Sequence, residues 1–393
     1  MIYLDNAATT EISPRVLNAM MPYLTKQYGN AGTLYNLGIE SARAIANARY
    51  SVARLIGSKT NEIIFTSGGS ESNSMVFNGV KNYLELLGKK HIVISKIEHD
   101  SVIKAAKNLI KDGFHLTYLP VNSYGIVDTD ELKQILETNN DVGLVSVMSM
   151  NNEIGSVNPV EYIGKICKEK EVLFHTDCVQ CLGSDVINTS SWNCDFLSLS
   201  SHKIHGPKGV GALYIRENVM KNILQPLIHG GASQEFGFRG GTENVAGIVG
   251  FGEACNVVFD NFTNNVTHVL NLKLMFYETL IKGLTDNKLE DLISINGYIG
   301  NRSKVLNIRI RNIDGETMVL LLDSLGICVS AGSACRSHES SPSHVLTGIG
   351  LSDDEARDSI RISFSAYNTE EEVITAANEI VNCIMVLEGV DGC

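Results

Sequence analysis

Seven short apolar segments between residues 63 and 215 constrain the fold of this chain more than any other feature. Most of them are rich in β-branched residues, and amphipathic stretches separate them. This alternation is typical of an α/β layer with a largely parallel sheet, in which ligands bind beyond the carboxyl ends of the strands. The predicted strands cover residues 63–66, 91–95, 116–119, 144–148, 172–175, 196–199 and 210–215.

The segments on either side of this layer predict a second, smaller α+β domain. Pro14 opens a helix that reaches about residue 26, and Thr369 with Glu372 forms a predicted capping box on the last helix. We expect a large domain over residues 15–262 and a small domain made of residues 1–14 and 263–393. The further expected helices cover about 39–56, 244–284, 316–325 and 370–387, and the strands of the tail lie near 292–295, 305–310, 327–330 and 360–364.

Charge and cysteine content narrow the range of partners and compartments. The net charge is −12, from 32 basic and 44 acidic residues, so we expect no direct binding to nucleic acid or to an anionic membrane. No apolar run has the length of a membrane span, and the N-terminus lacks the pattern of a signal peptide. The nine cysteines are scattered and odd in number, which indicates free thiols in a reducing cytoplasm. We interpret the C-x-x-C pair Cys178 and Cys181 as packing residues and predict no metal site.

The stretch SLSSHKIHGPKGVG at residues 198–211 delivers a lysine into a glycine-rich turn directly after a predicted strand. Ser200, Ser201 and His202 offer donors suited to a phosphate, and the glycines let the backbone lie close to a ligand. A partly desolvated Lys203 would act as an amine nucleophile, the role needed for a Schiff base with pyridoxal phosphate (PLP). Most lysines are solvated surface residues, so this stretch alone does not decide between the two interpretations.

Other predicted strand ends carry the remaining groups that PLP requires. Gly69 and Ser70 lie in a turn at a helix N-terminus, which binds phosphate or serves as an ordinary cap. His99 follows the next strand, where its ring would stack on a planar cofactor and move protons, or serve a structural role. Asp177 ends a strand, where a buried carboxylate needs a partner such as a protonated pyridine nitrogen, and Gln180 follows within reach of a ring oxygen. The set is far more specific than any single member.

A second nucleophile and a cation lie in the C-terminal part. Small residues surround Cys335 in the stretch VSAGSACRS. A thiol on such a loop suits attack on a sulfur atom better than a thiol packed in a core. Arg361, at the end of a predicted strand, would grip a substrate carboxylate in a bidentate fork or form a surface salt bridge.

Stretches spread over nearly the whole chain resemble the PLP-dependent cysteine desulfurases of the NifS/IscS type, within the class V aminotransferase group. They are YLDNAATT, TSGGSESN, NNEIG, HTDCVQ, SSHKIHGPKGVG, FRGGTEN, SAGSAC and YNTEEEV. The resemblance implies a fold-type I homodimer with its active site at the subunit interface. It also implies conversion of L-cysteine to L-alanine, with the sulfur passed through an enzyme persulfide.

The resemblance implies a role for each site residue as well. Lys203 would form the Schiff base, Asp177 would pair with the pyridinium nitrogen, and Gln180 would sit at the phenolic oxygen. His99 would lie over the ring, and Cys335 would be the nucleophile that takes the sulfur. Phosphate binding would fall to Gly69, Ser70, Ser200, His202 and Thr242 from the partner subunit, and carboxylate binding to Asn152 and Arg361.

The loop around Cys335 resembles the IscS-like branch, whose loop delivers the persulfide to acceptor proteins. Several positions depart from the family pattern, and they bear on the choice of acceptor. Ala31, Gly32 and Tyr35 replace the family's Pro, Ser and His, and Gly69-Ser70 replaces Ala-Thr. After the strand of Arg361, IscS-like members often carry an arginine, whereas this chain has Ser365-Ala366-Tyr367. The thiol is followed by the polar residues Arg336 and His338. The sequence leaves open Fe–S cluster assembly, tRNA thiolation, cofactor synthesis and DNA phosphorothioation, and also the use of selenocysteine.

Two other functions stay open at this point. Another class V lyase or transaminase, such as a selenocysteine lyase, would use Lys203 and Asp177 without needing Cys335. A non-catalytic sulfur-carrier subunit would need only the thiol loop and a dimer surface, and the presence of Lys203 and Asp177 argues against it. Bound PLP and release of alanine from cysteine would separate these alternatives.

Overall fold

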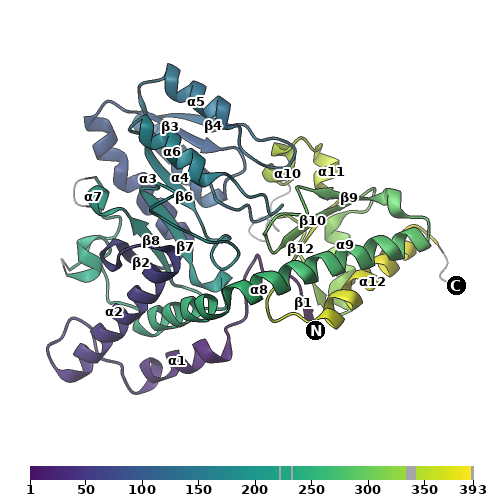
Figure 1. The fold of residues 1–393 in the computed structure, drawn as a ribbon, viewed down its shortest axis with the longest axis horizontal. Coiled ribbons are helices and arrows are strands. Elements are labelled where there is room, and N and C mark those ends of the chain that lie inside the picture. Colours follow the sequence, from purple (N-terminus) through teal and green to yellow (C-terminus); the bar gives the residue numbers. More distant parts are fainter. Residues whose placement is uncertain (221–222, 232, 333–341, 391–393) are drawn as a thin grey trace.

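A computed structural model describes residues 1–220, 223–231, 233–332 and 342–390 of the chain. It contains a seven-stranded sheet with the order β2-β8-β7-β6-β5-β3-β4 (Figure 1). Neighbouring strands are parallel, except that β8 is antiparallel to both β2 and β7. The predicted α/β class is therefore confirmed. The strands are β2 (Ile63–Thr66), β3 (His91–Ser95), β4 (His115–Leu119), β5 (Val142–Ser146), β6 (Leu173–Asp177), β7 (Phe196–Ser200) and β8 (Gly211–Ile215).

Helices cover both faces of this sheet because its strands are apolar on both sides. Successive side chains of a strand point to opposite faces, so Ile63 and Phe65 join one core and Ile64 joins the other. The core of Ile64 is closed by α3 (Gly69–Leu86), α4 (Asp100–Leu109) and the short α7 (Glu217–Met220). The opposite core is closed by α1 (Pro14–Thr25), α2 (Asn36–Ile56), α5 (Thr129–Thr138), α6 (Val160–Glu169) and the first half of α8 (Val245–Asp286).

The C-terminal part forms a smaller α+β unit around a three-stranded antiparallel sheet. Its central strand β10 (Val305–Ile310) pairs with β9 (Ile293–Asn296) and β12 (Ser359–Ser363). The N-terminal strand β1 (Ile2–Tyr3) pairs in parallel with β11 (Ile327–Cys328), which is shorter than the sequence predicted. The helices are α9 (Gly315–Ser324), the unpredicted α10 (His344–Gly348) and α11 (Asp353–Arg357), and α12 (Glu370–Leu387), which begins with the predicted capping box.

Helix α8 joins the two units and crosses the molecule from one core to the other (Figure 1). Its 42 residues span about 63 Å at the rise of an α-helix. Val258 packs in the core of the large sheet, whereas Leu272 packs in the core of the smaller sheet. Leu4 also belongs to the second core. The division into residues 15–262 and residues 1–14 with 263–393 stays a proposal, and this change of core along α8 supports it.

The carboxyl ends of β2, β3, β6 and β7 lie at one edge of the large sheet, because these strands run in the same direction. The chain leaves these strands at Thr66, Ser95, Asp177 and Ser200. Most predicted site residues follow closely, namely Gly69, Ser70, His99, Gln180, His202 and Lys203. The sheet thus gathers groups that are far apart in the sequence. In the part of the chain that is described, no helix combines the length and apolar character needed to cross a membrane.

Candidate active site

A cavity of about 210 Å³ lies at this edge of the sheet and is closed by the N-terminal segment and β12. It brings together the predicted residues of the large sheet with Asn152 and Arg361, whereas Thr242 is exposed and lies outside its lining. Cys335 lies outside the described residues. The lining consists of Ala7, Ala8, Gly69, Ser70, Asn73, His99, Ser101, Met148, Asn152, Asp177, Val179, Gln180, Ser200, His202, Lys203 and Arg361.

Lys203 is held at both its side chain and its main chain. It ends the short 3₁₀ turn that follows β7, and its Nζ donates to the carbonyl oxygens of Ala7 at 2.6 Å and Ala8 at 2.8 Å. Ala7 is itself anchored, since its N–H donates to Ser363 Oγ at 2.8 Å. Behind the turn, Lys304 Nζ donates to the carbonyl oxygen of Lys203 at 2.9 Å. The amine is therefore fixed at the cavity wall by neutral acceptors.

Asp177 presents a buried carboxylate to the same cavity. Its Oδ1 accepts the Val179 N–H at 2.9 Å, and its Oδ2 accepts Asn73 Nδ2 at 2.8 Å. Both donors are neutral, so they stabilise the carboxylate without cancelling its charge. The side chain is only 5% exposed, and a buried charge of this kind needs a cationic partner. A protonated ring nitrogen has the required character.

The turn at Gly69 and Ser70 begins α3 and lines the cavity. The first N–H groups of a helix have no partner within the helix, so they are suited to bind an anion. The turn packs closely on the loop after Asp177, because a Cβ atom added to Gly69 would lie 2.6 Å from Val179 Cγ2. His202 also lines the cavity, and its Nδ1 lies 3.1 Å from Thr9 Oγ1. Burial, together with the neighbouring lysines, lowers the pKa of His202 to about 4, so its ring is neutral near pH 7.

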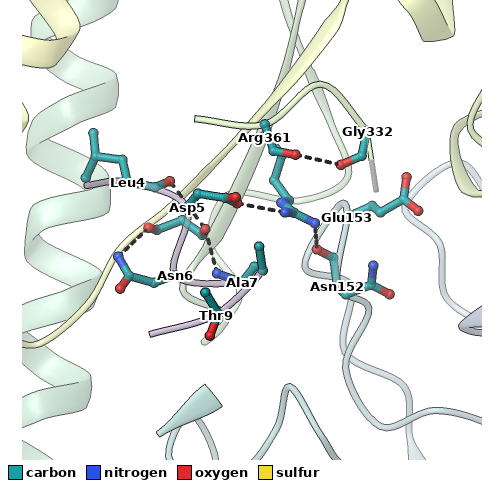
Figure 2. Close-up of polar contacts among 12 residues, drawn as sticks. Leu4, Asp5, Asn6, Ala7, Thr9, Asn152, Glu153, Gly332 and Arg361 are labelled. Carbon is teal, nitrogen blue, oxygen red and sulfur yellow. Dashed lines mark hydrogen bonds and ion pairs between the residues drawn. The ribbon is translucent and has the colours of Figure 1, made fainter. Parts of the chain in front are cut away.

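Arg361 lies in the middle of β12, not at its end as the sequence suggested. Its Nη1 donates to the carbonyl oxygen of Asn152 at 3.0 Å, and its Nη2 donates to Asp5 Oδ1 at 2.7 Å (Figure 2). The alternative of a surface salt bridge is wrong, since the Arg361 side chain is 2% exposed. The guanidinium group thus lines the cavity in a fixed orientation.

Three buried polar atoms of the cavity lack a hydrogen-bond partner within the described part of the chain. They are Asn73 Oδ1, Gln180 Oε1 and Arg361 Nε. Orphaned polar atoms are costly in a native protein unless a ligand or water satisfies them. With the amine of Lys203 and the carboxylate of Asp177, these atoms fit a polar aromatic cofactor and an amino-acid substrate. The residues present are therefore compatible with PLP.

Sequence reasoning missed several residues that support this site. Asn73 lies one helical turn after Gly69, so its helical spacing was available as a signal. Ser101 lies two residues after His99, in the first turn of α4. Glu98 is fully buried beside the site, and burial, followed by the charge of Asp177, raises its pKa well above the usual value. Asp5 and Lys304 are distant in sequence, and no local pattern could have assigned them.

Comparison with known proteins gives the family. The model of the aminotransferase class-V family matches residues 2–375, and the chain therefore belongs to this family. The chain is 43% identical over 373 residues to the cysteine desulfurase IscS of Dictyoglomus turgidum. The matched region covers 95% of this chain and 91% of the relative. The predicted resemblance to cysteine desulfurases of the NifS/IscS type is thereby confirmed.

Solved structures agree with this assignment. A NifS-like protein superposes with a TM-score of 0.88 at 36% identity, over 98% of this chain and 99% of that chain. A structure described as SspA in complex with cysteine gives a TM-score of 0.78 at 32% identity, over 94% of this chain and 100% of that chain. The predicted fold-type I architecture is confirmed by these similarities.

Proposed function

We propose that this protein is a PLP-dependent cysteine desulfurase, which converts L-cysteine to L-alanine and takes the sulfur onto Cys335 as a persulfide. The observation that carries the proposal is the meeting of Lys203, Asp177 and Arg361 in one cavity. These groups can attach PLP, keep its ring protonated and bind an amino-acid carboxylate. The similarity to the IscS protein of Dictyoglomus turgidum supports L-cysteine as the substrate.

The residues that would hold PLP match the chemistry of its groups. Lys203 would attach it through Nζ, and Asp177 would keep its ring nitrogen protonated. The N–H groups at the start of α3 would hold the phosphate together with Ser70, Ser200, His202 and Thr242 of a second subunit. When bound there, PLP supplies an electron sink that labilises bonds at the substrate α-carbon.

The substrate would be oriented by its carboxylate. Arg361 already donates to Asn152 and Asp5, and its buried Nε lacks a partner within the described residues. A carboxylate on this side of the guanidinium would receive charge-assisted hydrogen bonds. Lys203 would then take the α-proton at Nζ and later return a proton to the product. The carbonyl oxygens of Ala7 and Ala8, which accept from Nζ, hold the amine at the cavity between these steps.

The sulfur would leave the substrate by attack of the Cys335 thiolate. A sulfur–sulfur bond forms as the substrate carbon–sulfur bond breaks, and the electron pair of that bond stays with the carbon fragment that becomes alanine. The described residues that flank Cys335 are tied to the site, which supports this role. Ser330 and Arg361 exchange two backbone hydrogen bonds, and Ser343 donates to Glu153, which follows Asn152.

A homodimer and a separate sulfur-acceptor protein complete the proposal. Large apolar side chains are exposed on α1 and in the segment that leads to α2, with Leu24 57% and Leu34 94% exposed. A second copy of the chain would cover them and bring its Thr242 to this cavity. Seven cysteines of the described part are free, which supports a reducing, cytoplasmic location.

The decisive experiment measures alanine and sulfide release from L-cysteine by wild type, Cys335→Ser and Cys328→Ser, with the visible PLP spectrum of each. Cys328 is a suitable control because it is a partly exposed free thiol on β11. We expect the Cys335 variant to bind PLP and release neither product, while the Cys328 variant retains activity. Full turnover by Cys335→Ser would reject the assignment of the nucleophile. If wild type binds PLP but does not react with cysteine, the desulfurase function is rejected, and another reaction of the class V family remains.

A further inference from the structure

Three hydrogen bonds join Asp177 to His99 through Asn73 and Ser101. Asn73 Nδ2 lies 2.8 Å from Asp177 Oδ2 and 2.8 Å from Ser101 Oγ. Ser101 Oγ lies 2.8 Å from His99 Nδ1, and the Ser101 backbone N–H donates to the same nitrogen at 3.1 Å. Asn73 lies in α3, whereas His99 and Ser101 lie at the start of α4. The packing of α3 against α4 therefore creates this chain of hydrogen bonds.

The direction of each hydrogen bond follows from the chemistry of the groups. The carboxylate of Asp177 can only accept, so the amide of Asn73 must turn its NH₂ group toward it. The second N–H of the same amide then donates to Ser101 Oγ. The hydroxyl hydrogen of Ser101 is left to donate to His99 Nδ1, which also accepts the Ser101 backbone N–H. Nδ1 therefore receives two donors and carries no hydrogen of its own.

We propose that Asn73 is a positioning residue that transmits the orientation of the Asp177 carboxylate to His99 and fixes His99 as the neutral ring with its hydrogen on Nε2. A proton on Nδ1 would leave the Ser101 backbone N–H without its acceptor. His99 is also the N-cap of α4, a ten-residue helix, whose positive end opposes a cationic ring. His99 thus acts as a hydrogen-bond donor at Nε2, and Nδ1 is not a proton acceptor in the reaction.

The burial of Asn73 makes this arrangement specific. Asn73 is completely buried, it lines the cavity, and its Oδ1 lacks a partner within the described residues. If the Asn73 amide served only to stabilise the helices, its buried oxygen should also be hydrogen-bonded within the protein. For the reaction itself this inference rests on the proposed function, but the tautomer of His99 does not depend on it.

The test uses Asn73→Ala and Ser101→Ala, with Asn78→Ala as the control. Asn78 is on the same helix, and within the described residues its amide donates only to the carbonyl oxygen of Ser74. The nitrogen resonances of ¹⁵N-histidine-labelled holoenzyme would be recorded by long-range ¹H–¹⁵N NMR, and His99→Gln would assign the signal. The same protein samples would give the PLP spectrum and the kinetic constants.

We expect an unprotonated Nδ1 and a protonated Nε2 in wild type and in Asn78→Ala. Both tautomers should be populated in Asn73→Ala and in Ser101→Ala, and kcat should fall roughly tenfold, as for the loss of an outer-shell hydrogen bond in other sites. A hydrogen on Nδ1 in wild type, or unchanged His99 signals in both variants, would overturn the inference. If wild type releases no alanine but shows the expected tautomer, the proposed function fails and the inference stands.

Discussion

Arg361 Nη2 lies 2.7 Å from Asp5 Oδ1, and this pair joins β12 to the N-terminal segment beside the cavity (Figure 2). The two side chains are 2% and 16% exposed, so the guanidinium group is buried with a single carboxylate as its ionic partner in the described structure. The segment that carries Asp5 continues to Ala7 and Ala8, whose carbonyl oxygens accept from Lys203 Nζ. One short segment therefore holds both the Arg361 guanidinium group and the Lys203 amine.

Asp5→Asn should lower the free energy of unfolding by about 3 kcal/mol, because it leaves the buried Arg361 charge without its counter-ion. Urea denaturation of the holoenzyme would measure this loss. The matched control is Asp130→Asn, which breaks an exposed pair with Lys133 and should change stability by less than about 1 kcal/mol. Equal effects of the two substitutions would contradict a structural role for the Asp5–Arg361 pair.

Gly69→Ala should weaken PLP binding about tenfold, because the added methyl group overlaps Val179 Cγ2 and displaces the turn that we propose to hold the phosphate. Val179→Ala should restore most of the affinity in the double variant, since it removes the overlapping atom. Spectroscopic titration of the apoprotein with PLP would give the four dissociation constants. If the effects of the two substitutions simply add in the double variant, the contact between residue 69 and Val179 is not the cause of the weaker PLP binding. This contact gives a physical reason for glycine at a position where the family usually has alanine.

Lys304→Met should stabilise the protein most at neutral and lower pH. Burial, together with the charges of Lys203 and Arg361, lowers the pKa of Lys304 to about 7 in the folded protein, whereas the unfolded chain titrates near 10.5. Between these values the folded protein binds fewer protons, so the Lys304 penalty is largest below about pH 7 and disappears as the pH approaches 10.5.

Urea midpoints of wild type and Lys304→Met between about pH 6 and about pH 10 would test this. The exposed Lys26→Met is the control and should show no such trend. A stability difference that stays constant with pH would mean that burial does not lower the pKa of Lys304.

Glu98→Gln should become more stable than wild type as the pH rises. Burial and the charge of Asp177 raise the pKa of Glu98 well above its ordinary value of 4.5, so the folded protein holds a proton that the unfolded chain has lost. Wild type should therefore lose stability above about pH 4.5 until Glu98 ionises in the folded state, and the glutamine variant should not. Thermal unfolding over this pH range, with the more exposed Glu137→Gln as control, would measure the difference.

Local sequence was enough to predict the strands that position the site. β2, β3 and β10 begin and end at the predicted residues, because their apolar runs are bounded by polar residues and turns. The capping box at Thr369 and Glu372 likewise specifies where α12 begins. The helices α10 and α11 were not predicted, since each has only five residues and offers too little periodicity to recognise.

The sequence by itself determined that Lys203, Asp177, Gly69 and His99 meet, because parallel strands bring their carboxyl ends to one edge of a sheet. Only the tertiary structure decided what holds them. Asp5 is 356 residues from Arg361, and the Asn73–Ser101 contact exists only because α3 packs on α4. The burial of Asn73, Glu98 and Lys304 depends on the packing of the whole chain, and it cannot be deduced from the residues next to them in the sequence.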